Sequence, residues 1–288
     1  RIYYQTFSHS PSVAVRPGYV YYAGTHFNRS VTWWDYSGDW VTYLIRCQYL
    51  LQQGIPQADV CVYYGSGIEK RITYKQGASV LSPGYPYDYV NSDVILNRMH
   101  VRDGRICLPE GVSYEVMVLP PQKEISHEVL EKIRQLVYDG ATIIGPKPET
   151  SVGLYNYEET ERRVKEIADL LWGKEANGVV DRTYGKGRIV CGKSIDDVLS
   201  GKKILPDVEF LNRHDSIIYD FTHRKENDND IYYLANLTDG KDYPDVCFRV
   251  TGKVPQLWDP VNGSVTDVRV YTDDGKSIKI PRYFEPFG

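Results

Sequence analysis

Short apolar runs that end at glycine or proline alternate with helical segments through the middle of the chain, and this restricts the fold more than any other feature. The runs have the length of buried strands and lie at residues 59–64, 114–119, 141–145 and 187–192. Ser126 is a candidate N-cap, and apolar residues follow it with the 3.6-residue period until Gly140. A second helix is expected over about 158–172, ending at Gly173. This alternation predicts a parallel sheet with helices on both faces, a doubly wound α/β domain over residues 58–203.

Residues 1–57 have room for one strand and one helix. A strand over Arg1–Phe7 leads into a polar loop, and one apolar helix face then recurs at Trp40, Leu44, Cys47 and Leu51. Asp35 and Asp39 are expected to cap the start of this helix, and Gly54 to end it as the C′ residue. A strand, a loop and a helix form one repeat of a βα fold, which is less than a domain. Because the chain opens inside a strand, we expect it to be a piece of a longer protein.

The chain changes character over residues 204–288. Short strands are expected at 231–235, 246–250, 255–258 and 277–280, separated by Asp-Gly, Thr-Gly and Asn-Gly turns. This spacing predicts an antiparallel β-sandwich, and nothing in the sequence at 286–288 marks the sandwich as complete. His223 and the run 226–230 are expected in a solvated loop before the first strand, with a calcium site there as the alternative.

The stretch Thr25–Trp34 places polar and aromatic side chains close together, namely His26, Asn28, Arg29, Trp33 and Trp34. Aromatic faces stack on the C–H surfaces of sugars, and the three polar side chains offer directed hydrogen bonds to hydroxyl groups. Such polar groups are costly to bury among aromatic rings unless a ligand or another residue pairs with them. Two interpretations remain open, a wall of a sugar site and a loop whose tryptophans cap a core.

Composition excludes several classes of protein. The net charge is −4 and no basic block is present, which argues against nucleic acid or an anionic membrane as a partner. The five cysteines form no Cys-x-x-Cys pair, so neither a zinc site nor a disulfide framework is expected. The 25 tyrosines suit a saccharide cleft and a strand-rich fold equally well.

The middle region resembles the class I glutamine amidotransferase-like fold, a flavodoxin-like layout. That chemistry needs a cysteine on a sharp turn between a strand and a helix. The strand at 143–144 instead runs into Gly145-Pro146, and Cys107 lies in a strand-like run. We therefore expect this domain to lack a catalytic cysteine. The glycines at 185 and 187 are expected to form a tight turn into a strand, because the spacing and order of a phosphate-binding loop are absent.

The order of the short motifs along the chain resembles glycoside hydrolase family 106, whose members are α-L-rhamnosidases. The first motifs are Phe7-Ser8-His9-Ser10-Pro11, Gly24–Arg29, Thr32-Trp33-Trp34 and Tyr43–Gly54. They are followed by Tyr87–Asn91, Tyr184–Gly187, Ile231–Asn236, Phe248–Gly252, Leu257–Pro260 and Pro286–Gly288. The resemblance extends over essentially the whole chain in the same order.

This resemblance implies an inverting glycosidase on a (β/α)8 barrel, acting on a rhamnose-containing oligosaccharide or polysaccharide. Residues 1–57 would be the last strand, loop and helix of that barrel, whose remainder is a further partner. The substrate site would be bordered by His9, His26, Asn28, Arg29, Trp33 and Trp34. His9 would face it because active sites lie at the carboxyl ends of barrel strands, whereas a surface-loop histidine is the alternative.

Inversion needs a carboxylic acid and a carboxylate about 6.5–9.5 Å apart. In the family these acids lie on earlier barrel strands, and residues 1–57 contain no pair to replace them, so no catalytic residue is expected in this chain. The resemblance also implies Ca2+ at the sugar site of the full-length enzyme, with no metal ligand assigned here. The family resemblance is compatible with a periplasmic, an extracellular or a cytoplasmic location of the protein.

Two alternatives remain to the interpretation of this chain as part of a rhamnosidase. The middle region also resembles the domain that follows the barrel in family-42 β-galactosidases, where it serves in trimer contacts. The chain would then be a non-catalytic assembly module, or a fragment of a β-galactosidase-like enzyme.

Overall fold

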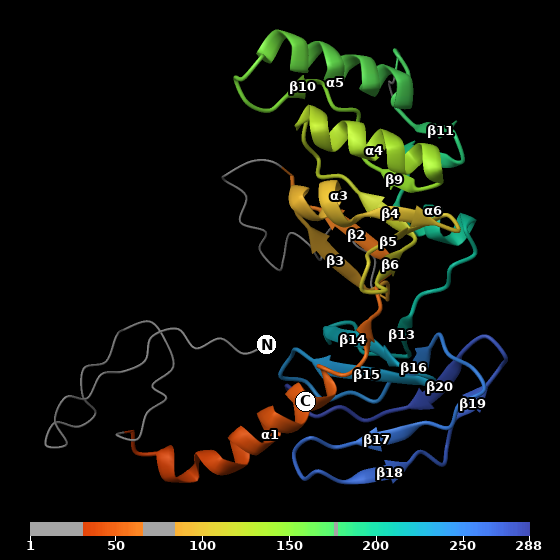
Figure 1. Cartoon of the computed structure of the whole chain (residues 1–288). Coiled ribbons are helices and arrows are strands. Elements are labelled where there is room, and N and C mark those ends of the chain that lie inside the picture. The colour runs from red at the N-terminus through yellow and green to blue at the C-terminus, as the bar shows by residue number, and fades with distance from the viewer. Residues whose placement is uncertain (1–30, 66–83, 176–177) are drawn as a thin grey trace, which may run out of the picture. The chain divides into compact units, whose positions relative to one another are not determined.

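The computed structural model describes residues 31–65, 84–175 and 178–288 (Figure 1). Contacts divide the chain into two units, one up to Gln53 with Lys253–Arg269, the other Gly54–Gly252 with Val270–Gly288. The described residues are a mixed α/β structure with several sheets, and no closed barrel is seen among them. The predicted strand Arg1–Phe7 lies outside the described residues, and the predicted domain boundaries stay predictions.

The described residues of the smaller unit form one long helix and one strand pair. A short 3-10 helix, η1 (Trp34–Tyr36), leads into α1 (Ser37–Leu50), while β17 (Gln256–Trp258) pairs antiparallel with β18 (Val265–Asp267). The Arg46 guanidinium donates to the carbonyl oxygens of Pro260, at 3.1 Å, and Val261, at 2.7 Å. These bonds attach α1 to the turn between the two strands.

Both predicted ends of α1 are wrong in detail. The N-cap is Tyr36 and no side chain caps the helix; Asp35 lies within η1 and Asp39 in the first turn of α1. There the carboxylates can still interact favourably with the helix dipole. The last turn closes at Leu51, so Gly54 lies beyond the helix.

The larger unit contains a six-stranded sheet in the order β11-β12-β9-β7-β2-β3. The strands are β11 (Val180–Tyr184), β12 (Gly187–Cys191), β9 (Thr142–Ile144), β7 (Val116–Val118), β2 (Val60–Tyr63) and β3 (Tyr87–Val90). All neighbours pair in parallel except β11 and β12. Those two form a hairpin in which Gly185 has φ +60, which confirms the predicted tight turn.

Helices cover both faces of this sheet, which is why its strands are apolar on both sides. Cys61, Met117 and Ile143 pack in one core with α4 (His127–Asp139) and α5 (Tyr157–Trp172). Their chain neighbours Val60 and Val116 point the other way and pack with α6 (Ile195–Gly201). The alternation follows from the two-residue period of a strand.

Local signals set the ends of α4 and α5 as predicted. The Ser126 hydroxyl accepts a hydrogen bond from the Val129 amide, and Gly140 and Gly173 follow the two helices with positive φ. The sequence analysis missed α3 (Ser92–Arg98), which Asn91 caps, and α6, which Ser194 caps. It also missed three short pairs: β4 (His100–Arg102) with β5 (Arg105–Cys107), β5 with β6 (Ser113–Tyr114), and β8 (Glu124–Ile125) with β10 (Thr150–Ser151).

Two antiparallel sheets follow in the same unit and share one apolar core. One consists of β13 (Val208–Leu211), β16 (Asp245–Phe248), β20 (Ile278–Pro281) and β19 (Thr272–Asp273). The other consists of β1 (Ile55–Pro56), β14 (Tyr219–Glu226) and β15 (Asn229–Asn236). Phe210 of the first sheet stacks on Tyr219 of the second, with ring centroids 4.2 Å apart.

The predicted loop around residues 223–230 is wrong. β14 continues through His223 to Glu226, and Asn227 and Asp228 alone connect it to β15. Asn227 adopts φ +53, which a two-residue hairpin turn requires and asparagine tolerates. His223 is therefore a strand residue, and it is buried.

Gly54 provides a test of the approach of β1 to β14. It has φ +55, and a Cβ on this residue would lie 2.1 Å from the Lys225 carbonyl oxygen. We expect Gly54→Ala to lower the free energy of unfolding by about 1–2 kcal/mol for the left-handed backbone. The clash adds roughly 1–3 kcal/mol.

Gly252→Ala is the matched control, because Gly252 has φ +70 and open space around the position of its Cβ. Denaturant unfolding of both variants separates backbone strain from the clash. Equal losses in the two variants would contradict the close approach.

Candidate functional site

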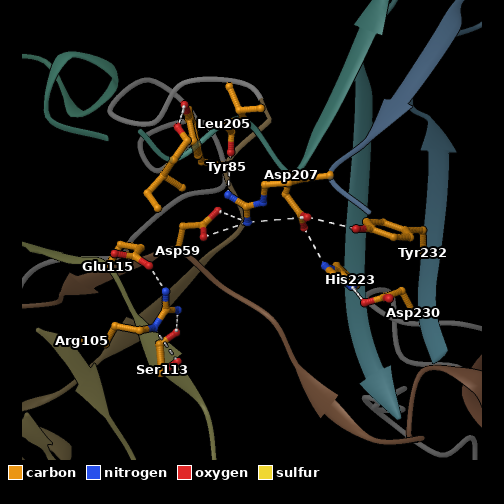
Figure 2. Close-up of polar contacts among 12 residues, drawn as sticks. Asp59, Tyr85, Arg105, Ser113, Glu115, Leu205, Asp207, His223, Asp230 and Tyr232 are labelled. Carbon is orange, nitrogen blue, oxygen red and sulfur yellow. Dashed lines mark hydrogen bonds and ion pairs between the residues drawn. The ribbon is translucent and has the colours of Figure 1, made fainter. Parts of the chain in front are cut away.

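His223 lies between two carboxylates in the larger unit (Figure 2). Its Nδ1 is 2.8 Å from Oδ2 of Asp207, which precedes β13, and its Nε2 is 2.9 Å from Oδ1 of Asp230, on β15. The side chains of all three residues are at most 7% exposed. A histidine that donates from both ring nitrogens carries a positive charge, which balances part of the two negative ones.

Tyr232 completes the surroundings of this histidine. Its ring stacks on the imidazole with centroids 4.0 Å apart and an interplanar angle of 17°. Its hydroxyl donates to Oδ1 of Asp207 at 3.0 Å, so both oxygens of Asp207 are hydrogen-bonded. Burial, together with the nearby Asp207 carboxylate, raises the pKa of the Tyr232 phenol, which stays a proton donor.

Arg249 connects this cluster to the parallel sheet. Its Nη2 donates to both carboxylate oxygens of Asp59, each at 2.9 Å, and lies 3.7 Å from Oδ1 of Asp207. Its Nη1 donates to the Leu205 carbonyl oxygen at 2.6 Å. Asp59 comes directly before β2, so the guanidinium joins the edge where that parallel strand begins to the antiparallel sheets.

A second group of charges lies at the same edge. Glu115, directly before β7, pairs with Arg105 and with Lys202, whose Nζ is 2.9 Å from Oε2. The Arg105 Nε also donates to the Ser113 hydroxyl, as Figure 2 shows. Each of the four buried carboxylates, on Asp59, Glu115, Asp207 and Asp230, therefore has a cationic partner. We call these side chains with His223, Tyr232, Arg105, Lys202 and Arg249 the polar cluster.

The polar cluster, apart from Tyr232 and Lys202, lines a cleft of about 500 Å³. Three lysines line it as well, Lys203, Lys225 and Lys276, and all three are exposed. Both ring nitrogens of His223 are already bonded to carboxylates, so it is not available as a general base. The geometry therefore fits binding and structural roles rather than proton transfer.

The structure describes two of the six predicted sugar-site residues. Trp33 is 41% exposed and meets Trp40 edge to face, with centroids 6.3 Å apart, while Trp34 is half-buried in η1. His9, His26, Asn28 and Arg29 lie outside the described residues. Sequence analysis missed the polar cluster because its partners come from distant segments and because His223 was expected in a loop rather than in β14.

Residues 31–65, 84–175 and 178–288 were compared with the arrangements that metal and thiol sites require. No three His, Cys, Asp or Glu side chains there are grouped to hold a metal ion, and Asp230 of the suspected calcium loop pairs with His223. All five cysteines are free thiols, and Cys107 lies in β5, as predicted, rather than on a turn. The helices in this part of the chain are too short or too polar to cross a membrane.

Comparison with known proteins gives the class. Residues 1–273 match the sequence profile of glycoside hydrolase family 106, described as alpha-L-rhamnosidase. The chain belongs to this family of glycoside hydrolases. A rhamnosidase from Novosphingobium sp. PP1Y has a similar structure, with a TM-score of 0.80 and 26% identity over 92% of this chain and 25% of that one.

Two further relatives were found. A Formosa agariphila protein, provisionally named beta-glucuronidase, is 36% identical over 272 residues, which are 94% of this chain and 22% of that protein. A family-42 β-galactosidase from G. stearothermophilus gives a TM-score of 0.47 at 10% identity, over 82% of this chain and 42% of that one. The chain thus spans a quarter or less of the length of the rhamnosidase and of the Formosa protein.

The charge on His223 predicts a pH dependence of stability. Burial lowers the pKa of the imidazole, but its hydrogen bonds to Asp207 and Asp230 outweigh this and raise the pKa above its usual value. The stabilisation is therefore complete below the unfolded-state pKa of about 6.5 and is lost as the pH rises through the folded-state pKa. We expect the melting temperature to fall over this range above pH 6.5.

His223→Gln should remove this dependence and cost roughly 3 kcal/mol at pH 6, because it leaves the two buried carboxylates without the charge between them. His100→Gln, at an exposed position in β4, is the control and should keep the slope of the wild type. Thermal unfolding from pH 6 to pH 9 measures both. An unchanged slope in His223→Gln would show that folding does not raise the pKa of the imidazole.

Proposed function

We propose that the chain is part of an enzyme that removes terminal α-L-rhamnosyl residues from glycans with inversion. The observation that carries this proposal is the family match over residues 1–273, supported by the similarity to the Novosphingobium rhamnosidase. The name of the Formosa protein favours a second candidate activity, the hydrolysis of β-glucuronides.

In this proposal the catalytic acid and base lie in another part of the enzyme. Inversion needs one protonated carboxyl group and one free carboxylate on opposite sides of the scissile bond. The four buried carboxylates of the polar cluster are each engaged by a cation, which suits neither role. Calcium at the sugar site of the full-length enzyme belongs to the same proposal, with no ligand assigned to this chain.

The proposed contribution of this chain is one side of the sugar pocket. His9, His26, Asn28 and Arg29 would bond to hydroxyl groups, with Trp33 and Trp34 providing apolar surface. The exposure of Trp33 supports this, because a ring that only capped a core would be buried.

We further infer the order of domains behind this activity: the end of a (β/α)8 barrel, an amidotransferase-like domain without a catalytic cysteine, and a β-sandwich. The parallel sheet with helices on both faces supports the second domain. The two antiparallel sheets that share a core support the third.

The test is the activity of the full-length gene product on matched p-nitrophenyl glycosides. We expect release of p-nitrophenol from the α-L-rhamnoside, with β-anomeric rhamnose as the first product observed by NMR. Turnover of the β-glucuronide or the β-galactoside without turnover of the rhamnoside would overturn the proposal. An α-anomeric first product would overturn only the inverting mechanism.

Trp33→Ala tests the role of the aromatic surface. Loss of one stacking face should raise KM for the rhamnoside by roughly tenfold, a change of about 1.4 kcal/mol, with a smaller effect on kcat. Trp258→Ala is the control, because Trp258 is 50% exposed in the same unit but lies in β17. Equal effects of the two variants would remove Trp33 from the substrate site.

A further inference from the structure

The cleft above the polar cluster presents positive charge. Its lining includes five basic side chains, Lys203, Lys225, Lys276, Arg105 and Arg249, and four acidic ones. The acidic side chains are at most 8% exposed, whereas Arg105 and Arg249 are 36% and 28% exposed. The three lysines are exposed as well. A molecule that enters the cleft therefore meets cations first.

These lysines form no ion pair among the described residues, although the Asp274 carboxylate interacts electrostatically with Lys276. Among the described residues, no carboxylate lies within ion-pair distance of the ammonium groups of Lys203, Lys225 or Lys276. By contrast, Lys202 beside them is paired with Glu115. The chain as a whole carries a net charge of −4, so a locally positive cleft is not a consequence of overall composition.

Lys203 also occupies an unusual backbone position. It has φ +61 one residue beyond Lys202, the C-cap of α6, whereas the C-caps of α4 and α5, which also have positive φ, are glycines. A side chain in this region is disfavoured by about 1–2 kcal/mol relative to a right-handed conformation. The position holds a lysine at the cleft although a glycine would be less strained.

We propose that this cleft binds the carboxylate or sulfate group of an acidic saccharide. Its volume is within the range of about 300–1,000 Å³ typical of small-molecule sites and suits one or two sugar rings. The lysines would bind the anionic group. The partly exposed guanidinium groups of Arg105 and Arg249 would add to the positive electrostatic potential in the cleft. The inference that the ligand is anionic rests on the charges of the cleft. The inference that it is a saccharide rests on the proposed function.

The experiment compares three sugars that differ in one group, using the full-length protein. Galacturonate carries a carboxylate, galactose 6-sulfate carries a sulfate, and galactose carries neither. We expect calorimetry to show binding of one or both charged sugars, no binding of galactose, and weaker binding as NaCl is added. Galactose binding as tightly as the charged sugars, or no binding of either charged sugar at millimolar concentration, would overturn the proposal.

The triple variant Lys203→Gln, Lys225→Gln, Lys276→Gln should weaken this binding by roughly tenfold, because three exposed charge contacts are lost. Lys174→Gln, Lys186→Gln, Lys241→Gln is the matched control, with the same change of charge at exposed positions outside the cleft. Equal affinities of the two variants would place the binding elsewhere and overturn the proposal.

Inorganic sulfate and the rhamnoside assay separate the remaining outcomes. Inorganic sulfate that binds as tightly as galactose 6-sulfate would show a bare anion site and overturn the saccharide part. Rhamnoside hydrolysis by the triple variant at the wild-type rate, with loss of acidic-sugar binding, would support the cleft independently of the activity. Failure of the wild type to hydrolyse rhamnosides would overturn the proposed function while the binding result still stood.

Discussion

The arrangement of the larger unit depends on the hydrogen bonds and ion pairs that the Arg249 guanidinium makes. It donates to Asp59 at the start of β2, to the Leu205 carbonyl on the segment leading to β13, and lies near Asp207. Arginine suits this position because its planar group offers five donors in fixed directions and stays charged when half-buried. This one side chain thereby contacts both the parallel sheet and the segment that leads into the antiparallel sheets.

The remaining charges in the polar cluster follow from that pairing. Asp207 is almost completely buried, and an isolated carboxylate there would be strongly destabilising. His223, Tyr232 and Arg249 surround its two oxygens, and Asp230 in turn accepts from the far side of the imidazole. Such a cluster contributes less net stability than an apolar core of the same volume would, but removal of His223 or Arg249 leaves Asp230 or Asp59, respectively, without its cationic partner.

Local chemistry made much of the fold predictable from the sequence. Strands β2, β7, β9 and β12, the Ser126 cap and the glycines after α4 and α5 depend on neighbouring residues, and the structure contains them as predicted. The strands β3 and β11 of the same sheet were not predicted. The polar cluster could not be found in this way. Arg249 and Asp59 are 190 residues apart in the sequence. The charged residues in Glu226-Asn227-Asp228 indicate a solvated loop until the partners of the neighbouring His223 and Asp230 are known. The predicted end of α1 was wrong because Gly54 allows the close approach to the Lys225 backbone and does not end the helix.

The register of the β14–β15 hairpin determines whether the polar cluster can form. His223 lies opposite Tyr232, and the two strands pair over eight residues. A slip by one residue would turn the strand over, placing the imidazole outside and leaving Asp207 and Asp230 without it. Mispaired hairpins are thus penalised by unpaired buried charge as well as by lost apolar contact. A cluster that adds little net stability to the native state can in this way select one strand pairing from several of similar hydrophobicity.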